Sequence, residues 1–244
     1  MQKALYPEGP GVCHAVVLHP PAGVAEGDSL SIEVGVGANA HAVIATPSAT
    51  RWYKSADRFA HQEVSLSIAA GGRLEWLPQE NLFFENARAT QALTIRAEPG
   101  ARMIAWDAYM LGRTAHGETW QAGTVRLASE LHVGRHMVFA ERGEIEGSDV
   151  ALDGGPGLAG MRCGATLWAL GDDSLAGFVE ELAPGLPYHA DLMAGASVPE
   201  KGLMVVRALG RDVGAVRALL QKIWASVRPV ALGLPAQPLR LWAC

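Results

Sequence analysis

The chain has 244 residues, of which 49% are hydrophobic and 18% charged, and its formal net charge is −5. This balance is typical of a packed globular protein and excludes an intrinsically disordered one. No basic cluster is present to neutralise phosphates, so nucleic acid is not an expected partner. The cysteines Cys13, Cys163 and Cys244 lie far apart, which argues against a disulfide framework or a zinc knuckle.

The sequence favours a cytoplasmic location without a membrane span. The first residues, "MQKALYPEGPG", lack the apolar segment of a signal peptide. The longest uncharged run, residues 34–50, contains glycine, asparagine, histidine and proline and is a poor membrane helix.

Short segments with alternating hydrophobicity fill the first two thirds of the chain. The pattern in "SLSIEVGVG" has period two, which indicates a β-strand, and turns follow at Gly71-Gly72 and Pro99-Gly100. Residues 123–144 predict a hairpin that turns near Gly134. The other expected strands lie within residues 14–20, 40–47, 63–72, 73–78, 91–100 and 101–112.

The C-terminal third contains the helical patterns. One helix is expected to begin with Asp173 or Ser174 as its N-cap and to stop at Pro184-Gly185. A second is expected within residues 210–229, ending at Pro229, and residues 201–210 between them predict a strand.

These patterns predict a mainly β fold of stacked, β-helix-like strands with two α-helices in the C-terminal third. A β-sandwich gives similar strand spacing and remains an alternative. We expect one domain over residues 1–244. It would comprise a strand-rich part over about 1–146, a loop over 147–160, and mixed strand and helix over 161–244.

Several signatures of catalysis are missing from the sequence. There is no phosphate-binding G-x-x-x-x-G-K-[ST], no G-x-S-x-G nucleophile motif and no H-E-x-x-H zinc motif. The chain therefore offers no recognisable nucleotide-hydrolysing, acyl-transfer or zinc-protease site.

Carboxylates at strand ends are the most suggestive chemical feature. Asp107 ends "RMIAW", Glu141 ends "HMVFA", and Glu80 and Glu85 flank "NLFF". Each one alone is explained by a strand end that faces solvent. As a set they are typical of an acidic lining, along which divalent cations pass without being held tightly, since thiolate ligands are absent.

Several blocks of the sequence resemble the urease accessory protein UreD family, also called UreH. The similarity runs in order from Tyr6 to Trp242 through "YPEG", "CHAVVLHPPAGVAEGDSL", "TPSATRWYKS", "LEWLPQENLFF", "AWDAYMLGR" and "PLRLW". The resemblance implies a non-enzymatic scaffold that binds apo-urease, recruits UreF and, through UreF, the GTPase UreG. It also implies a largely β architecture with two helices.

The resemblance further implies that nickel passes this protein in transit, with no tightly bound cofactor. The residues expected to line such a path are Asp28, Asp107 and Glu141, with Thr50, Glu80 and Glu85 as weaker candidates. We also expect the second helix and the tail to contact UreF through Trp224, Arg228, Leu241 and Trp242.

Two other classes of function remain open at this point. One is a cytosolic β-helical hydrolase or lyase that uses paired carboxylates as acid and base. The other is a plain metal-binding protein, which requires clustered histidine and cysteine that the sequence does not show.

Overall fold

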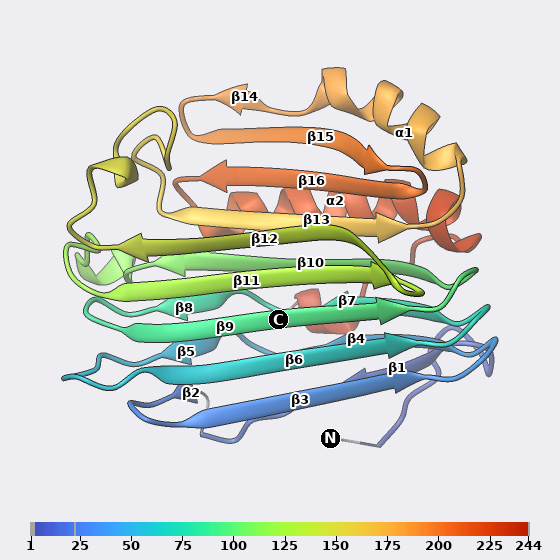
Figure 1. The fold of residues 1–244 in the computed structure, drawn as a ribbon, viewed down its shortest axis with the longest axis horizontal. Coiled ribbons are helices and arrows are strands. Elements are labelled where there is room, and N and C mark those ends of the chain that lie inside the picture. The colour runs from blue at the N-terminus through green and yellow to red at the C-terminus, as the bar shows by residue number, and fades with distance from the viewer. Residues whose placement is uncertain (1–2, 22, 244) are drawn as a thin grey trace.

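The computed structural model describes residues 3–21 and 23–243. Two β-sheets face each other, and two α-helices lie on the side of the larger sheet (Figure 1). The strands of the larger sheet are β1 (Cys13–Val16), β2 (Gly23–Val24), β4 (His41–Ala45), β5 (Thr50–Trp52), β7 (Arg73–Leu77), β8 (Asn81–Phe83), β10 (Arg102–Leu111), β13 (Cys163–Leu170), β14 (Tyr188–His189), β15 (Leu192–Glu200) and β16 (Leu203–Gly210).

The smaller sheet has five strands, and the helical elements complete the fold. Its strands are β3 (Ser29–Val36), β6 (Ala60–Ile68), β9 (Arg88–Ala97), β11 (Thr124–Val133) and β12 (His136–Glu146). The helices are α1 (Ser174–Leu182) and α2 (Val213–Leu232), with short 3₁₀ turns η1 (Thr114–His116), η2 (Val150–Leu152), η3 (Ala183–Gly185) and η4 (Arg240–Ala243).

The chain coils between the two sheets and adds a strand to each on every turn. In the larger sheet β1, β4, β7 and β10 run parallel, and in the smaller sheet β3, β6, β9 and β11 do the same. The stacked, β-helix-like arrangement predicted from the sequence is therefore confirmed. After β11 the chain changes to antiparallel pairing, beginning with the predicted hairpin of β11 and β12.

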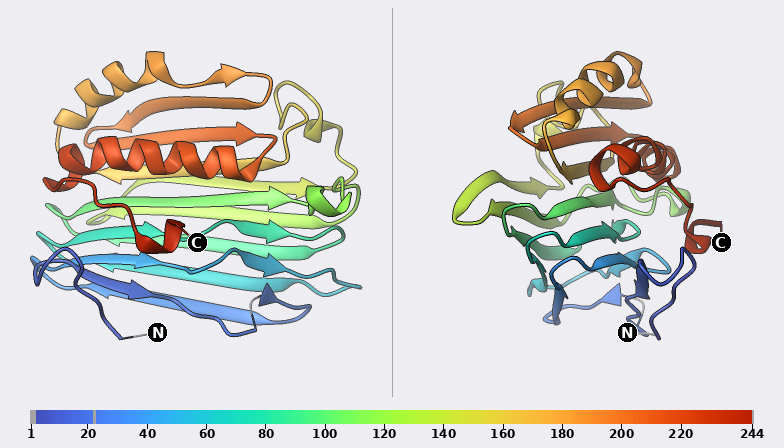
Figure 2. Two further views of the ribbon diagram at one scale, coloured as in Figure 1. Left: turned by 180° about the vertical axis from the view of Figure 1, so that it is seen from behind. Right: turned by 90° about the vertical axis from the view of Figure 1, so that its right-hand side faces the viewer.

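The two sheets differ in how their faces are covered. Along β6 the burial alternates strictly, because one face packs on the interior and the other meets solvent. In the larger sheet the far face is covered as well, by α2 and the C-terminal segment (Figure 2). Strand β7 is consequently buried on both faces, including Glu75.

The predicted end of the second helix at Pro229 is wrong. Helix α2 continues to Leu232. The next residue, Gly233, is its C-cap: it has a left-handed φ of 72° and donates its N–H to the Pro229 carbonyl at 3.0 Å. Proline is tolerated here because it removes one hydrogen bond within the last turn and no later turn depends on it. At the other end, the Asp212 carboxylate accepts from the Ala215 N–H at 2.8 Å.

The predicted N-cap position of α1 is confirmed at Asp173. Asp173 makes no capping hydrogen bond; the carboxylate of Asp172 accepts from the Ser174 N–H at 3.1 Å instead. The expected loop over 147–160 contains the 3₁₀ turn η2. The expectation of one domain over 1–244 includes residues 1, 2, 22 and 244, which lie outside the described part, and it stays a prediction.

Hydrophobic side chains form three clusters. One lies between the larger sheet and α2, and two lie between the sheets, toward opposite ends of the strands. No helix in the described part of the chain has the length and apolar character needed to span a membrane.

Candidate functional site

A band of polar side chains crosses the interior between the two inter-sheet clusters. On β6, Gln62 takes the inward position between Ala60 of one cluster and Val64 of the other. Gln91 is its partner in register on β9. Both glutamines are only 6% exposed. The parallel in-register pairing therefore stacks two amides inside the protein.

The larger sheet contributes the amide of Asn81 and the carboxylate of Asp107 to the same band. The Trp52 indole N–H donates to Asn81 Oδ1 at 3.0 Å, and Asn81 Nδ2 donates to Asp107 Oδ1 at 3.0 Å. Oε1 of Gln91 is buried without a hydrogen-bond partner. A buried polar atom without a partner is costly in an apolar surrounding, so this atom marks a polar interior space.

The pKa of Asp107 is raised to about 6. Burial is the main cause, because it disfavours the charged carboxylate. Hydrogen bonds from Gln91, the Ala108 backbone and Asn81 act in the opposite direction without cancelling it. No lysine, arginine or histidine in the described residues forms an ion pair with Asp107, which explains why burial prevails.

Asp107 lines two cavities on either side of the band. The first, of about 630 Å³, lies where β11 and β12 face β13, β15 and β16. The second, of about 800 Å³, lies toward β1, β3 and β4. Gln62, Gln91 and Thr50 line the second cavity beside Asp107.

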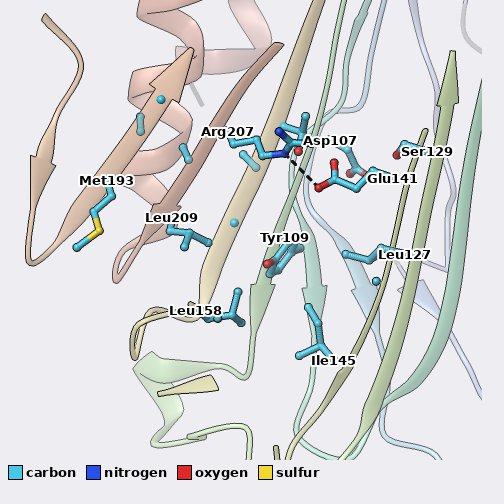
Figure 3. A pocket seen from close by; sticks show the side chains of 18 of the residues that line it. Asp107, Tyr109, Leu127, Ser129, Glu141, Ile145, Leu158, Met193, Arg207 and Leu209 are labelled. Atoms are coloured by element: carbon cyan, nitrogen blue, oxygen red, sulfur yellow. Dashed lines mark hydrogen bonds and ion pairs between the residues drawn. The ribbon is translucent and has the colours of Figure 1, made fainter. Parts of the chain in front are cut away.

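Polar residues continue from Asp107 across the first cavity. Asp107 is in register with Thr166 on β13, and Thr166 is in register with Arg207 on β16. Arg207 Nε lies 3.1 Å from Glu141 Oε1, which bridges the larger sheet to β12 (Figure 3). The side chains of Asp107, Thr166, Arg207 and Glu141 thus form a polar wall in this cavity.

Three of the six acidic-path candidates lie at these cavities. Asp107 lines both, Glu141 lines the first and Thr50 lines the second. Asp28, Glu80 and Glu85 line neither of them. The strand-end pattern alone did not distinguish these two groups of residues.

The other three candidates hold local structure. Asp28 sits in an exposed turn and accepts from the Ala25 N–H at 2.9 Å. Glu80 pairs with Arg217 of α2 at 3.3 Å. Glu85 accepts the backbone N–H groups at positions 120, 121 and 122, each at 2.7 Å, and so fixes the loop before β11.

Gln62, Gln91 and Asn81 belong to the band but were not predicted. A signal for two of them was present: each glutamine occupies a position that the alternation of its strand assigns to an apolar residue. Such a residue points into the interior, where it needs a partner or a polar space.

The expected partner-binding residues lie on the outer face of the larger sheet. Trp224 and Arg228 are buried, with Arg228 0% exposed, while Leu241 and Trp242 are half-buried. The Trp242 ring packs on Trp224 at 4.9 Å and on Trp106 at 5.7 Å between centroids. Trp224 and Arg228 therefore present no side chain to the surface of this chain, and the roles of all four stay predictions.

Arg228 is the centre of a buried ionic cluster. Its guanidinium contacts Glu75 at 3.0 Å and Glu8 at 2.7 Å. Glu75 also accepts from Trp224 Nε1 at 2.7 Å and lies 2.8 Å from His41 Nε2. We call these five residues the Arg228 cluster; they join the N-terminal segment, β4, β7 and α2.

No metal centre is apparent in the residues that the structure describes. Among them, no three His, Cys, Asp or Glu side chains gather closely enough to hold an ion. The band instead offers carboxylate, amide and hydroxyl oxygens spread along the cavity walls, a set that binds divalent cations weakly.

Comparison with known proteins gives a consistent result over the whole chain. A family model described as UreD urease accessory protein matches residues 1–243. The urease accessory protein UreD of Cupriavidus pinatubonensis is 46% identical over 246 residues, covering 100% of this chain and 85% of the relative. That of Bordetella pertussis is 44% identical over 248 residues, covering 100% of this chain and 87% of the relative.

These relatives are named as accessory proteins, which are not themselves enzymes. Their naming supports a non-enzymatic accessory protein over the alternative of a β-helical hydrolase or lyase. The chain belongs to the UreD family of urease accessory proteins, as its motifs predict.

Proposed function

We propose that this protein is a cytoplasmic scaffold for urease maturation that also gives nickel a path toward urease. In this proposal it binds apo-urease and recruits UreF and, through UreF, the GTPase UreG. Nickel is the cargo and is never a resident cofactor. The single observation that carries the path is the position of Asp107, which lines both cavities.

The chemistry of the polar band suits transit better than storage. Asp107 has no cationic partner among the residues that the structure describes, so at neutral pH its charge attracts a passing cation. The amides of Gln62, Gln91 and Asn81 supply weak oxygen ligands that replace part of the ion's water shell. Glu141 is held by Arg207, and this pairing keeps the first cavity from binding a cation too tightly.

The path is tested by neutralising its carboxylates. Asp107→Asn and Glu141→Gln are co-expressed with urease and its accessory proteins, and the nickel content of purified urease is measured. We expect Asp107→Asn to lower it about tenfold, because one charge contributes on the order of 1–4 kcal/mol along the path. Glu141→Gln is expected to lower it less, since Arg207 already neutralises that carboxylate.

The matched control for this experiment is Glu63→Gln. Glu63 is on β6 like Gln62, but it faces solvent. Capture of the partner proteins must stay at the wild-type level in all three variants. Normal nickel loading by Asp107→Asn within an intact complex would refute the path.

The tail is tested separately for its contribution to UreF binding. Deletion of residues 240–244 removes Leu241 and Trp242 from the outer face of the larger sheet. We expect this variant to lose most of its capture of UreF, and Tyr188→Ala, an exposed aromatic elsewhere on the chain, to retain it. Undiminished capture by the deletion variant would contradict the prediction.

A further inference from the structure

An apolar patch lies on the outer face of the larger sheet, beyond the N-terminal end of α2. Arg51 on β5, Leu82 on β8 and Met110 on β10 are in register and form one row across three strands. On each strand the adjacent residues point inward, and Trp52, Asn81, Phe83 and Leu111 among them are buried, so this row points outward. Tyr53 and Phe84 adjoin the row, with their rings edge to face at 5.3 Å.

The patch begins where the cover of the sheet stops. On β10, Ile104, Trp106 and Ala108 belong to the buried cluster under α2 and the C-terminal segment. Met110, the next outward residue, is only half-buried. A surface hollow of about 500 Å³ lies over it, bordered by η1. Figure 2 shows α2 and the C-terminal segment across this side of the sheet. The green turn η1 lies at one end of the strands.

Three basic side chains border this hollow, and one of its two arginines is already paired with a carboxylate. Arg51 is exposed and forms no ion pair with any described residue. The Arg113 guanidinium lies 4.1 Å from the centre of the Phe84 ring and pairs with Glu118. His116 on η1 is exposed at the same border. No carboxylate lines the hollow, although the net charge of the chain is −5.

We propose that this surface, the β5–β8 patch, binds a segment of a partner protein in which an apolar side chain is flanked by carboxylates. The inference rests on the proposed function, because it takes the partner from the same assembly. An apolar anchor fits the hollow between Leu82, Phe84 and Met110. The guanidinium of Arg51, which forms no ion pair with any described residue, can bind a carboxylate of this segment through two hydrogen bonds.

The experiment uses the complete chain, co-expressed with urease and the other urease accessory proteins. A photoreactive residue, p-benzoylphenylalanine, replaces Ala115, which is exposed at the border of the hollow. After irradiation of the purified complex, the cross-linked peptide is sequenced by mass spectrometry. We expect a partner segment with an aliphatic or aromatic residue between Asp or Glu residues.

A charge reversal completes the test. We expect Arg51→Glu to weaken capture of the cross-linked partner about tenfold or more, equivalent to about 1.4 kcal/mol. Arg135→Glu, an exposed arginine in the β11–β12 turn, is expected to leave capture unchanged. Equal capture by wild type and Arg51→Glu would overturn the inference.

The remaining outcomes are also decisive. Cross-links to nucleic acid, to a second copy of this chain or to a basic segment would overturn the inference, as would no cross-link from an intact complex. A wild-type chain that captures none of the co-expressed proteins would contradict both the inference and the proposed function. Capture without a cross-link would contradict the inference alone.

Discussion

The two faces of the larger sheet bury charge in opposite ways. On the outer face, Glu75 lies against Arg228, His41 and Trp224, and the pKa of Glu75 is lowered despite its burial. On the inner face, Asp107 has amide partners and no cation, and its pKa is raised to about 6. A buried carboxylate paired with a cation stays ionised and stabilises the fold. A buried carboxylate without a counter-ion is held partly protonated, and a cation that approaches it can become its partner.

The largest expected loss of stability comes from removing the cation of the Arg228 cluster. Arg228→Met leaves Glu75 and Glu8 buried without their cation, which typically costs about 3–5 kcal/mol. We expect the free energy of unfolding, measured by urea titration, to fall by that amount. The matched control is Arg217→Met, which removes a more exposed pair with Glu80 and is expected to cost less than about 1 kcal/mol.

A double variant tests whether the lost stability comes from the unpaired carboxylates. Adding Glu75→Gln to Arg228→Met removes one of the two uncompensated charges, so part of the lost stability is expected to return. Equal destabilisation by Arg228→Met and Arg217→Met would show that the Arg228 cluster does not behave as a buried network.

A smaller change in the free energy of unfolding, this time an increase, is expected when Asp107 is replaced. Because the folded-state pKa of Asp107 is raised to about 6, the folded protein keeps a proton that the unfolded chain releases at lower pH. The wild type therefore loses stability as pH rises from about 4 to about 6. Asp107→Asn has no such loss, and we expect it to be more stable by about 2 kcal/mol at pH 7.

The pH profile distinguishes this explanation from a simple packing change. Unfolding of wild type and Asp107→Asn is compared from pH 4 to pH 8. The stability difference should nearly vanish at pH 4 and reach its full value above pH 6. If the difference in unfolding free energy between the two proteins did not change with pH, ionisation of Asp107 would not be the cause of the destabilisation.

Local alternation made most of the fold predictable, and long-range contacts made the rest unpredictable. Period-two patterns found the strands, and the patterns around Leu175 and Val216 found both helices, because these depend on neighbours in sequence. Alternation along β7 places Glu75 on the opposite face from Leu74 and Trp76, and its neighbours in the sequence do not show that this face is covered. Its burial depends on α2, which lies about 150 residues later in the chain.

The candidate site was predictable only in part for the same reason. Asp107 and Glu141 were selected as carboxylates expected at strand ends, but the structure places them within β10 and β12, and the same criterion selected Glu85, whose role is to fix a loop. The alternation of β6 and β9 marked Gln62 and Gln91 as inward, yet only the register of the sheets places them together opposite Asp107.

The Arg228 cluster also constrains the order in which the protein is completed during synthesis. Its ionic contacts join residues 220 and 153 positions apart, so they need a segment that is synthesised after every strand of both sheets. The coils from β1 to β11 can stack earlier, since each pairs with a neighbour. Until α2 arrives, Glu75 and the outer face of β7 stay open to water. The nascent chain therefore exposes this surface while the strands are synthesised and covers it only after α2 has been made.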